Sequence, residues 1–178
     1  MKKFSEFYHD LNGEFRKNYP LANLTWFKVG GPAQMLFIPE NKDDLVKFIK
    51  TCPIKYPKTI IGAGSNLLIN DKGIKGLSLC MRNLKGIEID KNNGIIEVLS
   101  GEMLPTLARK AAASGLHGFE WAVGIPGTIG GAVVMNAGAQ EHCISSYLES
   151  ITTLSLPGEY IRIKGKDLNV GYRNSLLQ

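Results

Sequence analysis

The first hydrophobic positions of the chain follow a helical spacing. Aromatic and apolar side chains recur every three or four residues at Phe4, Phe7, Tyr8, Leu11 and Phe15. This spacing predicts an amphipathic N-terminal helix within residues 1–20, interrupted near Gly13. Two more helices are expected. Residues 42–50 have a capping residue at Asn41 or beside it, acidic residues in the first turn and lysines later, and residues 104–114 are rich in alanine and end before Gly115.

Short runs of apolar and β-branched residues predict strands elsewhere. The expected strands are 34–38, 58–61, 67–69, 75–81, 86–90 and 94–99, followed by a hairpin of 147–156 and 159–164. Several successive strands without intervening helices favour an antiparallel or mixed sheet. The pattern therefore predicts an α+β protein with two units, a first over residues 21–82 and a second over residues 83–178.

Composition limits the function classes that need to be considered. The 178 residues are 44% hydrophobic, enough for one large or two small globular domains. No apolar run is long enough to cross a bilayer, and the N-terminal segment lacks the apolar core of a signal peptide, so we expect a cytoplasmic protein with no membrane partner. The net charge is +5, but the lysines are scattered and not interleaved with aromatic residues. That pattern disfavours a nucleic-acid surface and suits an anionic small molecule.

The three cysteines, Cys52, Cys80 and Cys143, lie far apart and form no Cys-x-x-Cys pair. Neither a disulfide framework nor a zinc site is expected, and we predict no metal. The pair His142-Cys143 raises two alternatives, a metal or thiol-nucleophile site and a polar loop that holds one half-buried thiol. Of the two, the polar loop is favoured.

A first glycine-rich loop, Gly62-Ala63-Gly64-Ser65-Asn66, follows the strand expected at 58–61. Its glycines permit positive φ and the close approach of a ligand to main-chain N–H groups. A concave run of such amides is able to hold a phosphate. Taken alone, the loop is also compatible with a simple turn.

The second glycine-rich loop has the spacing Gly124-x-x-Gly127-x-x-Gly130-Gly131. It is neither the Gly-x-Gly-x-x-Gly fingerprint nor a P-loop, which disfavours a Rossmann NAD site and a nucleoside triphosphatase. Pro126 is suited to the first turn of a helix, and a helix start offers free N–H groups to a pyrophosphate. The alternative is close packing between a helix and a sheet. Two loops of this kind suit a long dinucleotide such as FAD.

Six segments together carry a resemblance to a known family. They are residues 23–33, 61–69, 115–120, 124–132, 135–138 and 172–175, which occur in the family's order and cover about residues 20–175. In these segments the chain resembles the N-terminal FAD-binding portion of the UDP-N-acetylenolpyruvoylglucosamine reductase (MurB) family.

The resemblance implies both a fold and a reaction. The fold is an FAD-binding domain of the vanillyl-alcohol-oxidase (PCMH) type, with the flavin between two α/β subdomains. The reaction is the reduction of UDP-N-acetylglucosamine enolpyruvate to UDP-N-acetylmuramate in peptidoglycan synthesis, with FAD as cofactor and NADPH as reductant. Arg173 matches the family's active-site arginine, a fixed cation suited to an anionic substrate, and Tyr172 is expected to line the same substrate site. The implied cofactor contacts are Gly62, Ala63, Gly64, Ser65, Asn66, Leu67, Gly124, Ile125, Pro126, Gly127, Thr128, Gly130, Gly131, Ala132, Asn136 and Gly138.

The sequence also departs from the family pattern. The family continues into a C-terminal substrate-binding domain with a serine proton donor and a glutamate, which these 178 residues lack. Ser175 belongs to the arginine motif and is not expected to act as that donor. The tyrosine and glycine that often follow the Asn136 motif are replaced from Gln140 onward. Two alternatives therefore stay open: a non-catalytic FAD- or nucleotide-binding remnant, and another flavin oxidoreductase of the same superfamily. The sequence predicts no particular oligomeric state.

Overall fold

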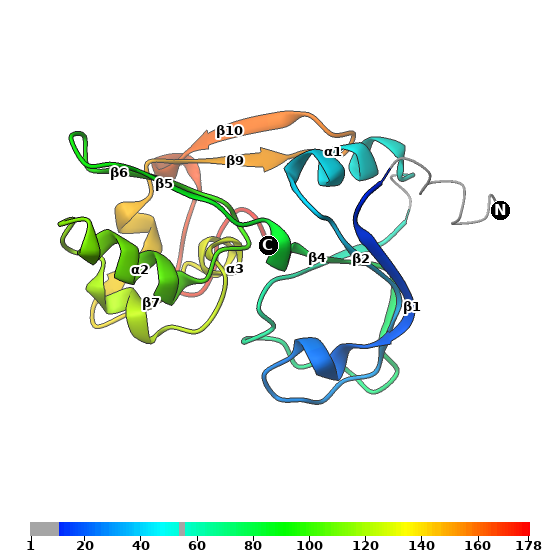
Figure 1. Ribbon diagram of the computed structural model, residues 1–178. Coiled ribbons are helices and arrows are strands. Elements are labelled where there is room, and N and C mark those ends of the chain that lie inside the picture. Colours follow the sequence, from blue (N-terminus) through cyan, green and yellow to red (C-terminus); the bar gives the residue numbers. More distant parts are fainter. Residues whose placement is uncertain (1–10, 54–55) are drawn as a thin grey trace. The chain divides into compact units, whose positions relative to one another are not determined.

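The computed structural model describes residues 11–53 and 56–178 (Figure 1), which cluster into two compact units. The first unit comprises the chain up to Leu84 together with Thr152–Ile161, and the second comprises Lys85–Ile151 and Arg162–Gln178. The segment Thr152–Ile161 thus groups with the first unit, whereas the expected boundary placed everything after residue 82 in the second. The reason lies in its packing: Leu154 contacts the apolar cluster of the first unit.

A four-stranded mixed sheet organises the first unit. Its order is β1-β2-β4-β3, in which β1 is antiparallel to β2 and the other neighbours are parallel. The strands are β1 (Glu14–Pro20), β2 (Pro32–Ile38), β3 (Lys58–Ile61) and β4 (Ile74–Cys80), and short 3-10 helices occupy Leu21–Leu24 and Met81–Asn83. The expected strands at 34–38, 58–61 and 75–81 and the mixed sheet are confirmed.

Two local predictions in this unit are wrong. Residues 14–20 form a strand and not a helix, because Phe15 pairs across the sheet with Phe37 and the two rings stack with centroids 4.3 Å apart. This cross-strand pairing outweighs the helical spacing of the apolar residues; Phe4, Phe7 and Tyr8 lie outside the described residues. Residues 67–69 form an irregular segment and not a strand, and Ile69 packs beside Gly30.

Helix α1 (Lys42–Thr51) follows β2 and begins where the sequence predicted. The Asn41 side chain caps it by accepting a hydrogen bond from the backbone N–H of Asp44. Phe48 of this helix packs against Phe37 of β2, with ring centroids 4.5 Å apart. Neighbouring residues of β2 enter two different apolar clusters, Phe37 one and Leu36 the other, so both faces of this strand are buried.

The second unit is built from a helix pair and short hairpins. Its elements are β5 (Ile87–Asp90), β6 (Ile95–Val98), α2 (Leu104–Ala113), a 3-10 helix at Glu120–Gly124, α3 (Ile129–Val134), β7 (Gly138–Ala139), β8 (His142–Cys143) and 3-10 helices at Ile144–Tyr147 and Gly165–Asp167. The hairpin of β9 (Ser150–Leu154) and β10 (Tyr160–Lys164) connects to it. The expected strands at 86–90 and 94–99, helix 104–114 and final hairpin are confirmed.

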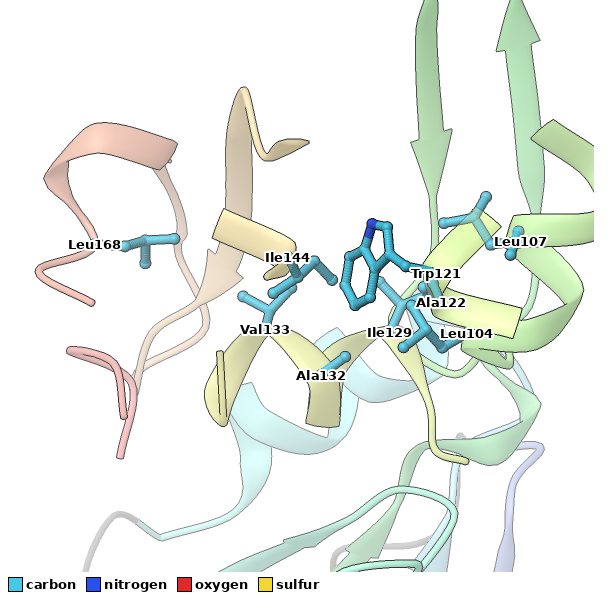
Figure 2. Packing of buried hydrophobic residues seen from close by; sticks show 10 residues of the cluster. Leu104, Leu107, Trp121, Ala122, Ile129, Ala132, Val133, Ile144 and Leu168 are labelled. Carbon is cyan, nitrogen blue, oxygen red and sulfur yellow. The ribbon is translucent and has the colours of Figure 1, made fainter. Parts of the chain in front are cut away.

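The core of the second unit surrounds Trp121, which is 7% exposed. Val133 of α3 and Ile144 lie beside it in Figure 2, and Leu104 of α2 belongs to the same cluster. This packing fixes α3 and the loop before it, so the second glycine-rich loop has a rigid base. Among the described residues, no helix has the length and apolar character needed to cross a membrane.

Candidate functional site

The first glycine-rich loop leaves the end of β3 and turns at Gly64, whose φ is +70°. A Cβ at this position would lie 2.0 Å from the carbonyl oxygen of Leu24. Only glycine satisfies both the positive φ and the close approach to the Leu24 backbone. Gly64 is therefore required by the loop's own fold, whether or not a ligand is present.

Hydrogen bonds that the carbonyl oxygens accept fix the orientation of the peptide groups in this loop. Arg82 donates to the carbonyls of Gly62 and Ala63, and the backbone N–H of Trp26 donates to that of Gly64 at 3.1 Å. By contrast, no protein acceptor within the described part of the chain faces the backbone N–H groups of Gly62, Ala63, Gly64 or Asn66. Unbonded amides in a glycine-rich turn are the donors that an anion such as a diphosphate needs. This donor set fits the phosphate portion of FAD.

The second loop does not offer its helix start in the way the sequence suggested. Thr128 is the N-cap of α3, and its Oγ1 accepts from the N–H of Gly131 at 3.4 Å. The next amides are also bonded, Ile129 N–H to the Glu102 carbonyl and Gly130 N–H to the Ser100 carbonyl, both at 2.8 Å. The expectation of free N–H groups for a pyrophosphate at this helix start is therefore wrong. Pro126 lies before the N-cap and not in the first turn.

What the second loop offers is open space next to its backbone. Within the described part of the chain, no atom lies within 4 Å of a Cβ built on Gly124, and at Gly131 Thr128 Oγ1 alone comes near, at 3.5 Å. Neither glycine has a positive φ, so the fold itself does not require glycine at either position. A flat ligand surface would use the space that a side chain would fill. Gly130 differs, because its Cβ would lie 3.0 Å from that of Ser100, so α3 packs closely here against the turn that follows β6 and not against a sheet.

Arg173 lies in a tight turn closed by an antiparallel bridge between Gly171 and Asn174. Its φ is +56°, an uncommon conformation for a bulky residue and one that is found at functional sites. Its Nη2 donates to the Gly138 carbonyl at 2.9 Å, and its guanidinium lies 5.3 Å from the ring centroid of Tyr172. Tyr172 is 91% exposed. The two predicted substrate residues thus present a held cation and an aromatic ring to solvent.

Asn136 connects this turn to the end of α3. Its Nδ2 donates to the Gly171 carbonyl at 3.0 Å, and its Oδ1 accepts from the N–H of Ser145 at 3.3 Å. The side chain is buried and both of its polar ends are engaged. Asn136 and Gly138, predicted to contact the cofactor, are thereby brought together with Arg173, predicted to contact the substrate.

Ser175 is also part of this arrangement but faces inward. Its Oγ donates to the Val134 carbonyl at 2.7 Å, and the residue is buried. This agrees with the expectation that Ser175 is not a proton donor. Gly138 likewise has a structural reason to be glycine, because its Cβ would lie 2.3 Å from the His142 carbonyl oxygen.

The His142-Cys143 pair forms strand β8, which pairs with Gly138–Ala139, and not the loop expected from the sequence; its side chains have polar neighbours. The Tyr147 hydroxyl and His142 Nδ1 are 2.9 Å apart, and the Cys143 Sγ lies 3.2 Å from Ser145 Oγ and 3.4 Å from Ser146 Oγ. Hydrogen bonds with these two hydroxyls hold the pKa of the Cys143 thiol below its ordinary value, and Ser145 has the larger effect. Within residues 11–53 and 56–178, no three His, Cys, Asp or Glu side chains are grouped to hold a metal ion.

A separate cavity of about 530 Å³ lies outside all of these sites. It is lined by Glu149, Ser150, Arg162, Lys164 and Lys166. None of the residues predicted from the sequence to bind the cofactor or the substrate lines it. The candidate sites are therefore the backbone donors of the first unit and, taken separately, the open glycines and the Arg173 turn of the second unit, and not this cavity.

Comparison with known proteins identifies the class of fold. A family model described as an FAD binding domain matches residues 33–164, most of the chain, and the chain belongs to this family. The structure is also similar to that of 6-hydroxy-D-nicotine oxidase from Arthrobacter nicotinovorans, with a TM-score of 0.64 at 16% identity over 88% of this chain and 37% of that one. The predicted fold, an α+β FAD-binding domain of the vanillyl-alcohol-oxidase type, is confirmed.

More similar relatives share one name. A UDP-N-acetylenolpyruvoylglucosamine reductase of Prochlorococcus marinus (strain NATL2A) is 78% identical over 166 residues, 93% of this chain and 57% of that protein. The crystal structure of the reductase of that type (MurB) from Thermus caldophilus has a TM-score of 0.73 at 30% identity and covers 93% of this chain and 57% of that one. The resemblance to the MurB family is confirmed, and the chain spans little more than half the length of these relatives.

Proposed function

We propose that the chain binds FAD and forms the flavin-binding part of an NADPH-dependent reductase that converts UDP-N-acetylglucosamine enolpyruvate to UDP-N-acetylmuramate in peptidoglycan synthesis. The observation that carries this proposal is the 78% identity to a reductase of that name across 93% of the chain. Cytoplasmic residence and a small-molecule UDP-sugar partner belong to the same proposal.

The first loop is proposed to hold the diphosphate of FAD. The donors are the backbone N–H groups of residues 62–64 and Asn66, which have no acceptor in the described part of the chain. Ser65 and Leu67 complete the proposed contact surface. Because amide donors at fixed positions need no reorganisation, such a loop is suited to an anion.

The second loop is proposed to lie against a flat part of the cofactor. Open space beside Gly124 and Gly131 supports this role. When bound, FAD supplies hydride transfer between NADPH and the enolpyruvyl group. The protein's part here is to keep its own side chains away from the ligand. The remaining proposed contacts, with mainly supporting roles, are Ile125, Pro126, Gly127, Thr128, Gly130, Ala132, Asn136 and Gly138.

Arg173 is proposed to stabilise negative charge on the enolpyruvyl group of the substrate. Its guanidinium is held by the Gly138 carbonyl and the Tyr172 ring, and its conformation at positive φ is kept by the turn. A cation fixed before the reaction stabilises developing charge without paying the reorganisation energy that water requires. No residue of this chain is assigned as the proton donor.

The test is FAD binding followed by turnover. Purified protein, stripped of cofactor, is titrated with FAD and followed by flavin fluorescence; absence of saturable binding contradicts the proposal. NADPH oxidation is then measured with the UDP-enolpyruvyl sugar. FAD binding without turnover supports the alternative of a non-catalytic flavin-binding portion. Where turnover is present, Arg173→Ala should lower it far more than it lowers FAD content, and Arg173→Lys should restore part of it.

A further inference from the structure

Arg82 is placed where no motif in the sequence pointed to it. It lies in the 3-10 helix Met81–Asn83 directly after β4, and the partners that its guanidinium has among the described residues are main-chain carbonyls. Nε donates to Gly62 at 3.0 Å, and Nη2 donates to Ala63 and to Leu24, both at 2.6 Å. Within the described residues it forms no ion pair with a carboxylate. A charged guanidinium that binds three neutral carbonyl groups instead of a carboxylate needs an explanation.

The reason lies in the geometry of the peptide group. A trans peptide is planar, and its C=O and N–H bonds point in opposite directions. The carbonyl of Gly62 shares a peptide with the N–H of Ala63, and the carbonyl of Ala63 shares one with the N–H of Gly64. Because Arg82 holds both carbonyls, it turns both N–H groups to the opposite side of the loop. These two amides have no protein acceptor among the described residues.

We propose that Arg82 is the positioning residue of the first loop: it orders the Gly62 and Ala63 carbonyls so that the Ala63 and Gly64 amides face a diphosphate. This inference rests on the proposed function, in which FAD occupies that loop. Arg82 does not contact the ligand in this assignment, since the described donors of its guanidinium are directed at carbonyls. Its effect passes through the backbone.

Arginine suits this role better than lysine does. The guanidinium is planar and presents several donors in a fixed fork, so one side chain satisfies three carbonyls from two segments of the chain. Lysine has one ammonium group on a flexible stem and cannot reproduce that fork. The third carbonyl, Leu24, is the group against which Gly64 packs, so the same side chain also holds the wall behind the loop.

The experiment compares Arg82→Met, Arg82→Lys and the control Arg16→Met. Arg16 is a surface residue whose guanidinium pairs with Glu14 two residues away. Three quantities are measured: the unfolding midpoint without ligand, the Kd for FAD by calorimetry, and the amide NMR shifts of Ala63 and Gly64 on addition of FAD or inorganic diphosphate. The ³¹P shift of saturating bound FAD reports whether the loop still contacts its phosphates.

We expect Arg82→Met to raise the Kd for FAD about tenfold or more, Arg82→Lys to raise it less, and Arg16→Met to leave it unchanged. The ³¹P shift of bound FAD in Arg82→Met should move toward that of free FAD. A purely structural role would lower the unfolding midpoint and leave that shift unaltered, which overturns the inference. If Arg82→Met does not fold, the ³¹P shift of bound FAD and the Ala63 and Gly64 amide shifts are compared between the wild type and Arg82→Lys instead.

The two proposals fail in different ways. Wild-type binding of FAD with an unchanged Kd in the Arg82 variants overturns the role of Arg82 and leaves the proposed function standing. If the wild type binds no FAD but diphosphate still shifts the Ala63 and Gly64 amides, and only when Arg82 is present, the proposed function falls and the positioning role holds. Wild-type protein that responds to neither probe contradicts both.

Discussion

Glycines of the two loops are needed for different physical reasons. Gly64 has a positive φ and no room for a Cβ, whereas Gly124 and Gly131 have ordinary φ values and open space. The fold requires glycine at the first kind of position, whereas glycine at the second kind leaves space beside the backbone that a ligand could occupy. The two cases look the same in the sequence, and the backbone φ and the space around the Cβ position distinguish them.

Gly64→Ala should destabilise the protein by at least about 2 kcal/mol, because the strain of a positive φ adds to a collision with the Leu24 carbonyl. Denaturant unfolding monitored by circular dichroism measures it. Gly94→Ala is the matched control. Gly94 has φ +67° and no atom of the described residues within 4 Å of its Cβ, so that substitution retains the φ strain alone, about 1 kcal/mol. Equal losses in the two variants would show that the Leu24 contact is relieved.

Cys143 should react with iodoacetamide at lower pH than an ordinary cysteine does. Its hydrogen bonds with Ser145 and Ser146 lower the pKa of the thiol, so the reactive thiolate persists as the pH falls. Cys52 should stay unlabelled in the folded protein, since it is buried and burial raises its pKa. Labelling rates at each cysteine, read by mass spectrometry across a pH series, test this. Replacing both serines by alanine should move the Cys143 midpoint upward, and an unmoved midpoint would contradict the cause given.

At the scale of elements, α3 combines a complete cap with a glycine that its own structure does not require. Gly131 lies in the first turn, where its N–H is bonded to Thr128 Oγ1. Alanine would add a methyl group at ordinary contact distance from that oxygen. Helix propensity favours alanine over glycine by up to about 1 kcal/mol. The presence of glycine is thus a local disadvantage that a ligand would explain.

Gly131→Ala should therefore raise the free energy of unfolding of the cofactor-free protein by up to about 1 kcal/mol and at the same time weaken FAD binding. Chemical unfolding without FAD and calorimetric titration with FAD measure the two effects separately. Gly130→Ala serves as the neighbouring control, and it should lower stability because its Cβ meets Ser100. Unchanged FAD affinity in Gly131→Ala would remove this residue from the proposed cofactor site.

Local sequence signals predicted the elements whose interactions are close in the chain. The Asn41 cap and the helix end before Gly115 each act within a few residues, and α1 and α2 were predicted from them. Strand β1 was missed because its partner Phe37 is more than 20 residues away and local spacing favoured a helix.

The sequence predicted which segments form the candidate site, but not how their backbone groups are hydrogen-bonded. Glycine spacing and the family motifs marked both loops and Arg173. They could not show that the first amides of α3 are bonded to the Ser100 and Glu102 carbonyls, because these carbonyls belong to a turn before α2, far from α3 in the sequence. Nor did any signal mark Arg82, because an arginine after a strand has no distinctive spacing. Its role depends on which carbonyls the fold brings to it.

At the scale of the whole molecule, FAD should stabilise the chain by mass action. At a free concentration of one hundred times Kd the gain is about 2.7 kcal/mol, which corresponds to roughly 5–10 °C in Tm for a chain of this size. Two single-tryptophan variants report on the units separately. Trp121→Phe leaves the exposed Trp26 of the first unit, and Trp26→Phe leaves the buried Trp121 of the second. Since Trp121 Nε1 has no partner among the described residues, the phenylalanine substitution breaks no hydrogen bond there.

Both reporters should show the higher transition temperature, because each unit contains one of the proposed FAD loops. Riboflavin serves as the control ligand, since it lacks the diphosphate proposed to occupy the first loop. A shift confined to one reporter would restrict FAD binding to that unit, and no shift in either would contradict the cofactor proposal.

The grouping of Thr152–Ile161 with the first unit has a consequence for how such a protein can be divided and recombined. The polypeptide passes from one unit to the other after Leu84, Ile151 and Ile161. A fragment that stops at Leu84 lacks Leu154, which packs against the cluster around Phe37 and Phe48, and lacks Gly158, whose Cβ would meet Lys50. No single crossover point therefore exchanges one unit intact between relatives. A functional chimera has to carry the tip of the β9–β10 hairpin along with the N-terminal sheet on which it packs.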